Sequence, residues 1–378
     1  MKPIHIGLIG TGFMGRTHSN AYGQVHKFFQ HDLQPVCKVV CDTDAEKTRA
    51  FAENWGWEQV EDDWRRLIRR KDVDVIDICT PNHLHYEMAM LAAQEGKLII
   101  CEKPLALNAH EALAMTEAVE NSGKASMVSF NYRRVPAIAL AKQMIDQGRL
   151  GRIFHYRAKY LQDWTISPDV PQGGKTLWRL DSKSAGSGVT GDLLAHSIDL
   201  ALWMAGPIQQ VTAMTETFIK ERKLQDDPTV TRPVEIDDAC AFLARFENGA
   251  LGTFESTRYA RGRKNQNTFE INGEKGTIAF DLETPHLLEY YDHSKDVMSR
   301  GFSQIQVWDA DHPYMKHWWV PGCSIGYEHT FIHEISDFLY GIERNEKLVP
   351  DFRDGYETQL VCDTVLDSAR SCTWQRVK

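Results

Sequence analysis

The N-terminal third of the chain alternates short, almost continuously apolar runs with segments of helical period. The apolar runs cover residues 4–9, 36–41, 73–79, 97–102 and 125–129. Segments with a helical spacing of apolar residues lie between them, at 16–29, 45–55, 64–68, 86–95 and 109–122. Apolar strands joined by helices are typical of a doubly wound parallel sheet. We therefore expect an α/β domain whose ligands lie at the carboxyl ends of the strands.

The rest of the chain has longer strand-like runs and fewer helices. The runs cover residues 153–162, 210–218, 237–246, 249–259, 268–272, 276–281 and 287–291, and turns such as Asn272-Gly273 join several of them. Helices are expected at 137–147, 191–205, 327–344 and 355–371. This pattern predicts an α+β domain with a large, open, mostly antiparallel sheet. We place the boundary near residue 130, which gives domains over residues 1–129 and 130–378.

The first apolar run ends in a glycine-rich turn, Gly10-Thr11-Gly12-Phe13-Met14-Gly15, with the spacing G-x-G-x-x-G. Gly10 allows the tight turn, Gly12 allows the backbone to approach a pyrophosphate, and Gly15 allows the helix to pack closely on the strand. Phosphates would then accept hydrogen bonds at the positive end of the helix dipole. A structural turn without a ligand is the alternative. The strand before it and the helix after it favour a dinucleotide-binding domain of the Rossmann type over residues 1–129.

An acidic residue, Asp42, follows the second strand. A carboxylate there can accept hydrogen bonds from both ribose hydroxyls of NAD and would repel a 2′-phosphate. The spacing from the glycines is longer than the usual length of about 20 residues, and an extended connection over residues 26–35 would explain it. A solvated strand end is the alternative. No arginine near Thr43 could bind a further phosphate, so the sequence favours NAD over NADP.

Composition narrows the functional class. A length of 378 residues suggests two or three domains, and 42% hydrophobic and 25% charged residues are ordinary for a globular protein. The net charge of −9 argues against a nucleic acid partner, and no apolar run approaches the roughly 18 residues of a membrane span. Because Lys2-Pro3 leads directly into the first strand, we expect no secretory leader. The eight cysteines form no C-x-x-C pair and no H-E-x-x-H array occurs, which indicates reduced thiols in the cytoplasm and no metal site.

Polar residues gather after two later strands of the first domain. Thr80-Pro81-Asn82-His83-Leu84-His85 follows one strand, and Glu102-Lys103-Pro104 follows the next. A lysine beside a dinucleotide is placed to act on a substrate, and a surface ion pair with Glu102 is the alternative. We expect His83 and His85 to shape the cofactor loop rather than to take part in chemistry.

One helix of the second domain, over residues 191–205, carries three polar residues. Asp192, His196 and Asp199 lie at positions i, i+4 and i+7, and therefore on one face. Asp192 as an N-cap and His196 as a buried core histidine are the structural alternative. Glycines in the approach to the helix, Gly186-Ser187-Gly188, would permit close contact with a ligand.

Together these segments resemble the glucose-fructose oxidoreductase and inositol dehydrogenase family, Gfo/Idh/MocA. The similarity covers essentially the whole chain, and the motifs that carry it are Gly10–Gly15, Thr80-Pro81-Asn82-His83, Cys101-Glu102-Lys103-Pro104-Leu105, and Gly191-Asp192 with His196 and Asp199. Residues 130–134, 160–164, 185–188 and 325–327 are similar to a subgroup that oxidises a secondary hydroxyl, typically at C3, of a sugar such as levoglucosan or a glucoside.

The resemblance implies an NAD-dependent oxidoreductase with Lys103, Asp192 and His196 as catalytic residues. Neutral His196 can take the hydroxyl proton near pH 7. The Lys103 ammonium can stabilise the developing alkoxide, and Asp192 can hold a neighbouring hydroxyl or the imidazole. Hydride goes to the nicotinamide, so no metal is required.

The resemblance also implies two sets of binding residues. The predicted cofactor-binding residues are Gly10, Gly12, Phe13, Met14, Gly15, Asp42, Thr80, Asn82, His85, Glu102, Lys103, Asn131, Trp178 and Arg179. The predicted substrate-binding residues are Lys103, Tyr132, Gln162, Asp163, Arg179, Asp192, His196 and Tyr327. The second domain would bind the sugar and form a homo-oligomer, either a dimer or a tetramer.

Three other functions remain open at this point. Some relatives keep NAD bound and cleave glycosides through a 3-keto intermediate and elimination. An inositol dehydrogenase would use the same residues on a cyclitol. Other relatives bind dinucleotide and regulate transcription, although the intact Lys103, Asp192 and His196 and the lack of an evident DNA-binding element argue against that function.

Overall fold

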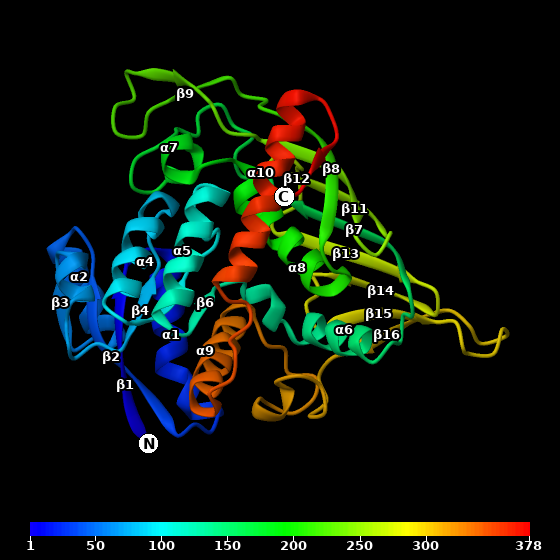
Figure 1. Cartoon of the computed structure of the whole chain (residues 1–378), viewed down its shortest axis with the longest axis horizontal. Coiled ribbons are helices and arrows are strands. Elements are labelled where there is room, and N and C mark those ends of the chain that lie inside the picture. The colour runs from blue at the N-terminus through cyan, green and yellow to red at the C-terminus, as the bar shows by residue number, and fades with distance from the viewer. The chain divides into compact units, whose positions relative to one another are not determined.

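The chain divides into two compact units, and the computed structural model describes all residues from 1 to 378 (Figure 1). Unit 1 comprises Met1–Arg134 and Ile325–Glu357, and unit 2 comprises Val135–Ser324 and Thr358–Lys378. The first boundary lies close to the predicted one. The single division at residue 130 does not describe the compact units, because residues 325–357 belong with unit 1.

Unit 1 is built on a six-stranded parallel sheet with the order β3-β2-β1-β4-β5-β6. Its strands are β1 (Lys2–Ile9), β2 (Leu33–Cys41), β3 (Gln59–Glu61), β4 (Val75–Ile78), β5 (Leu98–Cys101) and β6 (Ser126–Val128). Strand β4 is buried at every position, as expected for a strand covered on both faces. The predicted doubly wound α/β fold is confirmed.

The helices of unit 1 are α1 (Phe13–Phe28), α2 (Ala45–Trp55), α3 (Trp64–Ile68), α4 (His85–Gln94), α5 (Ala109–Ser122) and α9 (Tyr327–Arg344), with short turns η1 (Asn82–Leu84) and η2 (Asn131–Arg134). The expected extended connection over residues 26–35 is wrong. Helix α1 continues to Phe28 and β2 begins at Leu33, so the 16-residue helix and nine-residue strand account for the long spacing to Asp42.

Helix α9 has the predicted bounds but lies in unit 1 rather than in a C-terminal domain. It packs on α1, and the Phe331 ring lies 5.4 Å from the His18 ring. Turn η2 is joined to α9 by a hydrogen bond from Asn131 Nδ2 to Thr330 Oγ1 at 2.9 Å. The sequence pattern predicted the bounds of this helix but not the partner that covers it.

Unit 2 contains a nine-stranded sheet with the order β16-β15-β14-β13-β7-β12-β11-β8-β17, in which only the β7–β12 pair is parallel. The strands are β7 (Ile153–Leu161), β8 (Ile208–Glu216), β11 (Ala239–Phe246), β12 (Leu251–Thr257), β13 (Gln266–Gly273), β14 (Gly276–Asp281), β15 (Leu287–Asp292), β16 (Phe302–Gln306) and β17 (Gln375–Arg376), and β9 (Glu221–Lys223) pairs separately with β10 (Thr231–Pro233). The predicted open, mostly antiparallel sheet is confirmed.

The strands of this sheet alternate buried and exposed residues, as in β11 and β12, so one face is covered and the other is open. Helices α6 (Pro136–Asp146) and α8 (Ala195–Ala205) lie against this sheet (Figure 1), and α10 (Phe352–Ser371) contributes a hydrogen bond from Ala213 N–H of β8 to Ser368 Oγ. No helix of the structure is both long and apolar enough to span a membrane.

The predicted helix over residues 191–205 begins differently. Residues Thr190–Leu194 form a π-helical turn, η4, and α8 continues from it. Asp237 fixes this start, because its carboxylate accepts hydrogen bonds from Gly188 N–H at 2.7 Å and Thr190 N–H at 2.8 Å. A Cβ at Gly188 would lie 1.9 Å from the Asp237 carbonyl oxygen, so this glycine permits packing on residue 237. Contact of the Gly186-Ser187-Gly188 segment with a ligand stays a prediction.

Candidate active site

The glycine-rich turn of unit 1 leaves the start of α1 open for an anion. Gly10 has a φ of 104°, and a Cβ there would lie 2.6 Å from the Cys79 carbonyl oxygen. A Cβ at Gly15 would lie 2.1 Å from the carbonyl oxygen of Gly10, so close packing of helix on strand requires this glycine. Gly12 is the N-cap, has no side-chain cap and faces open space. Free N–H groups beside open space suit a pyrophosphate.

Asp42 lies at the end of β2 with its carboxylate held by backbone and side-chain donors. Oδ2 accepts hydrogen bonds from Thr11 N–H at 2.9 Å and Thr11 Oγ1 at 2.6 Å, and Oδ1 accepts one from Thr43 N–H at 2.7 Å. Partial burial works against ionisation, but these donors outweigh it and lower the pKa of Asp42. A fixed anion here fits a ribose diol and disfavours a 2′-phosphate.

The segment after β4 is tied to the segment after β5 by His85. Its imidazole is fully buried, with Nδ1 at 3.0 Å from the carbonyl oxygen of Pro104 and Nε2 at 2.9 Å from that of Thr80. Burial lowers the pKa of His85. Asn82 belongs to the segment after β4 and is buried in η1. His85 therefore couples the predicted cofactor loop to the Glu102-Lys103-Pro104 motif.

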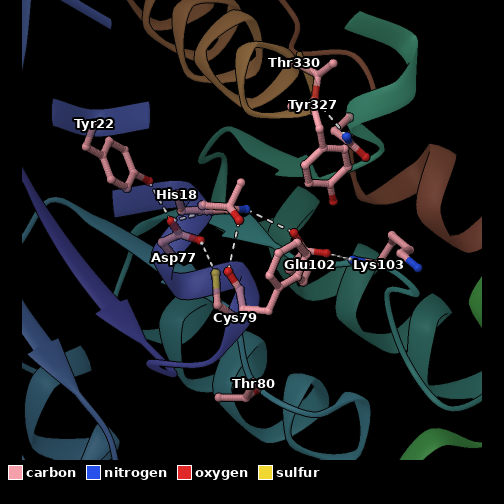
Figure 2. Close-up of polar contacts among 12 residues, drawn as sticks. His18, Tyr22, Asp77, Cys79, Thr80, Glu102, Lys103, Tyr327 and Thr330 are labelled. Carbon is pink, nitrogen blue, oxygen red and sulfur yellow. Dashed lines mark hydrogen bonds and ion pairs between the residues drawn. The ribbon is translucent and has the colours of Figure 1, made fainter. Parts of the chain in front are cut away.

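Glu102 and Lys103 follow β5 and face different surroundings. The Glu102 carboxylate is buried, where Oε1 lies 3.0 Å from His18 Nε2 and Oε2 accepts a hydrogen bond from Lys103 N–H at 3.2 Å. The Lys103 side chain is half-buried and extends away from that carboxylate (Figure 2). The contact between the two residues is therefore made by the backbone N–H of Lys103 and not by its ammonium group.

Three aromatic residues predicted for the cofactor or the substrate lie together in unit 1. Phe13, at the start of α1, is 54% exposed and stacks on Tyr327 with a centroid distance of 6.0 Å. Tyr132 meets Tyr327 edge-on at 6.4 Å. The structure thus groups residues from the glycine-rich turn, η2 and α9.

In unit 2 the Asp192 carboxylate lies between two guanidinium groups. Arg258 Nη2 donates to Oδ2 at 2.6 Å, and Arg179 Nε lies 3.8 Å from Oδ1. Asp192 sits within η4, not at an N-cap, so the capping alternative is wrong. His196 follows on α8, is buried, and lies 6.0 Å from the Tyr160 ring.

The remaining predicted residues of unit 2 divide into two groups. Arg179 stacks on Trp178 at 4.3 Å, and Gln162 bridges Asn265 and Trp164 through hydrogen bonds of 2.9 and 2.8 Å. Asp163 has a separate set of partners: its carboxylate accepts from Lys264 Nζ and Gly262 N–H, each at 3.0 Å, and these donors lower its pKa. Its contacts are those of a residue that fixes a loop.

Sequence reasoning missed several buried residues of these sites. Arg258 comes directly after β12 and is fully buried against Asp192, although arginine near a strand end normally suggests an exposed position. His18 and Asp77 are buried in unit 1, where Nδ1 of His18 lies 2.9 Å from Oδ2 of Asp77. In the sequence, only Asp77 could have indicated this buried pair, because a carboxylate inside an apolar strand requires a buried partner.

Comparison with known proteins agrees with this geometry. The profile described as the oxidoreductase family with NAD-binding Rossmann fold matches residues 4–130, and that of the GFO/IDH/MocA C-terminal domain matches residues 138–279. Levoglucosan dehydrogenase of Pseudarthrobacter phenanthrenivorans is 42% identical over 99% of this chain and 98% of its own length. The chain belongs to the Gfo/Idh/MocA oxidoreductase family.

Two solved structures are similar to this chain along its whole length. An oxidoreductase domain protein from Kribbella flavida is 45% identical with a TM-score of 0.96, and levoglucosan dehydrogenase in complex with NADH and levoglucosan is 42% identical with a TM-score of 0.95. Both alignments cover 100% of each chain. The predicted family, the cofactor NAD and the class of NAD-dependent oxidoreductase acting on a sugar or polyol are confirmed at the level of this Gfo/Idh/MocA family.

Proposed function

We propose that this Gfo/Idh/MocA protein oxidises a secondary hydroxyl, at C3, of levoglucosan or a glucoside and passes the hydride to NAD. The observation that carries the proposal is the Asp192 carboxylate held by Arg258 and Arg179, with His196 four residues later. A fixed anion and a neighbouring imidazole suit a substrate with several hydroxyls. The full-length similarity to levoglucosan dehydrogenase supports a sugar of this kind.

The proposed cofactor residues fit NAD by their chemistry. The open start of α1 at Gly12 would hold the pyrophosphate, and the ionised Asp42 would accept the ribose hydroxyls. The nicotinamide supplies the hydride acceptor when NAD is bound. Residues 1–129 would thus bind the cofactor, whereas residues 130–378 would supply most of the sugar contacts.

Each catalytic residue has a role that follows from its chemical type. His196, as a neutral imidazole, takes the proton of the reacting hydroxyl. Lys103, as an ammonium, stabilises the alkoxide that develops. Asp192 accepts a hydrogen bond from a neighbouring hydroxyl, and its two arginine neighbours keep it in place. Tyr132, Gln162, Arg179 and Tyr327 complete the proposed sugar-binding set, and Asp163 supports it through its loop.

A substrate panel tests the proposal. NADH formation is followed with levoglucosan, glucosides, inositols and free sugars, and the product of the best substrate is examined by NMR for a C3 ketone. We expect levoglucosan or a glucoside to give the highest kcat/KM. Fastest turnover of an inositol would make the protein a cyclitol dehydrogenase, and glycoside cleavage without net NADH would make it a glycosidase that retains NAD. No reduction of NAD by any compound would overturn the proposal.

Variants connect the activity to the named residues. We expect Lys103→Met and His196→Gln to lose most of the turnover while NAD still binds. Lys124→Met is the matched control for the lysine, because Lys124 is exposed in the same unit. Normal rates in either catalytic variant would show that the roles are assigned wrongly.

We also propose a homo-oligomer in the cytoplasm. The open face of the nine-stranded sheet carries exposed apolar residues, among them Met214, Leu243 and Leu251, and a hollow of ≈ 520 Å³ lies on this face. A patch of this kind favours association. All eight cysteines are free, which suits a reducing compartment. Elution as a monomer in a sizing experiment would contradict the oligomer.

A further inference from the structure

A buried histidine of α1 lies between two carboxylates that belong to other elements. His18 is 1% exposed, with Nδ1 at 2.9 Å from Asp77 Oδ2 and Nε2 at 3.0 Å from Glu102 Oε1 (Figure 2). Asp77 lies on β4 and Glu102 directly follows β5. The catalytic roles proposed above do not use His18 or Asp77.

The hydrogen-bond partners of His18 favour a charged ring. Asp77 accepts two further hydrogen bonds, from Tyr22 OH at 2.8 Å and from Cys79 Sγ at 3.5 Å. If both carboxylates are ionised, they can only accept, so each ring nitrogen of His18 donates, and only an imidazolium has two N–H groups. Burial disfavours the charged ring, but the Asp77 carboxylate outweighs it and raises the pKa of His18 well above its usual value.

A metal ion is a poorer explanation of the same cluster. Ligand atoms of His18, Asp77 and Cys79 lie within 4.8 Å of one another. A cysteine ligand must be deprotonated, yet burial and the Asp77 carboxylate raise the pKa of Cys79 well above its usual value. The hydrogen bonds to Asp77 and Glu102 also occupy both nitrogens of His18.

The cluster is connected to the proposed catalytic lysine through Glu102. Oε1 of this carboxylate faces His18, and Oε2 accepts the hydrogen bond from Lys103 N–H at 3.2 Å. We infer that His18 is a positioning residue, an imidazolium that holds Glu102 against β4 and thereby fixes the backbone from which Lys103 projects. The inference rests on the proposed role of Lys103 in sugar oxidation.

His18 also connects this backbone to the cofactor site. It lies on the first turns of α1, the helix whose start would hold the pyrophosphate. One ring therefore joins α1, β4 and the segment after β5. Glu334 of α9 and Arg134 of η2 are further ionisable groups near this cluster, and the burial of Glu334 raises its pKa to about 7.

The charge of His18 is tested by NMR of the unaltered protein. The ring nitrogen resonances are assigned by their disappearance in His18→Gln. We expect both nitrogens to stay protonated between about pH 6 and about pH 9, a range over which an ordinary histidine loses one of its two ring protons. A ring that carries only one proton anywhere in this range would overturn the inference. A neutral His18 beside a protonated Glu102 would give that result.

The positioning role is tested by kinetics and by the Lys103 amide resonance. Because a displacement of about 1 Å can cost on the order of 100-fold in rate, we expect His18→Gln to lower kcat by that factor and to change the KM for NAD little. The Lys103 amide proton should shift upfield as its hydrogen bond to Glu102 weakens. The double variant His18→Gln/Glu102→Gln should lose no more than the greater of the two single losses.

The matched control is His31→Gln. His31 is also buried in unit 1, and its Nε2 lies 3.1 Å from Ser336 Oγ, without contact to Glu102 or Lys103 in these hydrogen bonds. We expect it to affect stability but not kcat. Equal losses of kcat in both histidine variants would show that His18 has only a structural role and would contradict the inference. Normal turnover in Lys103→Met would instead reject the proposed function, while the protonation of His18 could still be observed.

Discussion

Arg258 donates a hydrogen bond from Nη2 to Asp192 Oδ2 at 2.6 Å, and its side chain is 1% exposed whereas that of Asp192 is 20% exposed. The guanidinium lies 5.2 Å from the centre of the Trp164 ring. The arginine is thus the inner member of the pair, and Asp192 is the member that can reach a ligand.

From the Arg258–Asp192 pair we predict a large loss of stability when the Asp192 carboxylate is removed. Asp192→Ala leaves the buried guanidinium without its partner, which should cost about 3–5 kcal/mol in the free energy of unfolding. Arg258→Met/Asp192→Ala should recover part of that loss, because no buried charge remains. Denaturant unfolding of the two single variants and the double variant measures the coupling. Asp169→Ala, an exposed site in the same unit, is the control, and additive losses would contradict the prediction.

Asp42 predicts the choice of cofactor. Its carboxylate stays ionised because donors from Thr11 and Thr43 lower its pKa, so a 2′-phosphate would meet a fixed negative charge. We expect Asp42→Ala to lower the ratio of kcat/KM for NAD to that for NADP by roughly tenfold or more, since like charges in contact cost several kcal/mol. Asp62→Ala, which changes an exposed carboxylate, should leave the ratio unchanged. Unchanged selectivity in Asp42→Ala would remove this residue from the cofactor site.

Local patterns predicted much of the fold because they act over short distances. Strand β14 and helix α9 have the predicted bounds, and Gly10 and Gly15 are required by contacts with neighbouring backbone. The unit to which α9 belongs was not predictable in the same way. An amphipathic helix shows which face is buried, but the covering partner, α1, is about 300 residues away in the sequence.

The buried charges of the sites depend on contacts that no local pattern carries. His18 meets Asp77 across 59 residues, and Asp192 meets Arg258 across 66 residues. Each pair is assembled only when separate elements pack. The π-helical start at Asp192 likewise depends on Asp237, which lies on another segment of the chain. Sequence reasoning therefore named Asp192 but could not name the arginine that holds it.

Two variants of Tyr327 distinguish a role in sugar binding from a role in packing against the cofactor site. Its ring stacks on Phe13, and it is 38% exposed. If its hydroxyl binds the sugar, Tyr327→Phe should raise the KM for the sugar roughly tenfold, the equivalent of one hydrogen bond, with the KM for NAD unchanged. Tyr327→Ala should raise the KM for NAD as well, because Phe13 loses the ring beside it. Tyr291→Phe in unit 2 is the control, and an unchanged sugar KM in Tyr327→Phe would exclude the hydroxyl contact.

Glu334 predicts how stability depends on pH. Burial raises its pKa from 4.5 to about 7, although Arg134 and His18 act in the opposite direction. Between these values the folded protein keeps a proton that the unfolded chain has released, so stability falls as pH rises toward 7 and then levels off. The loss amounts to about 3 kcal/mol.

Glu334→Gln removes this dependence, because an amide does not ionise. Relative to the unaltered protein, the variant should gain up to about 3 kcal/mol in the free energy of unfolding between about pH 4 and about pH 8. Urea unfolding at the two pH values measures the difference. Glu346→Gln, at an exposed position shortly after α9, should show no such gain. If the Glu334→Gln protein differed from the unaltered protein equally at both pH values, Glu334 would have the same pKa in the folded and unfolded states, and the prediction would be wrong.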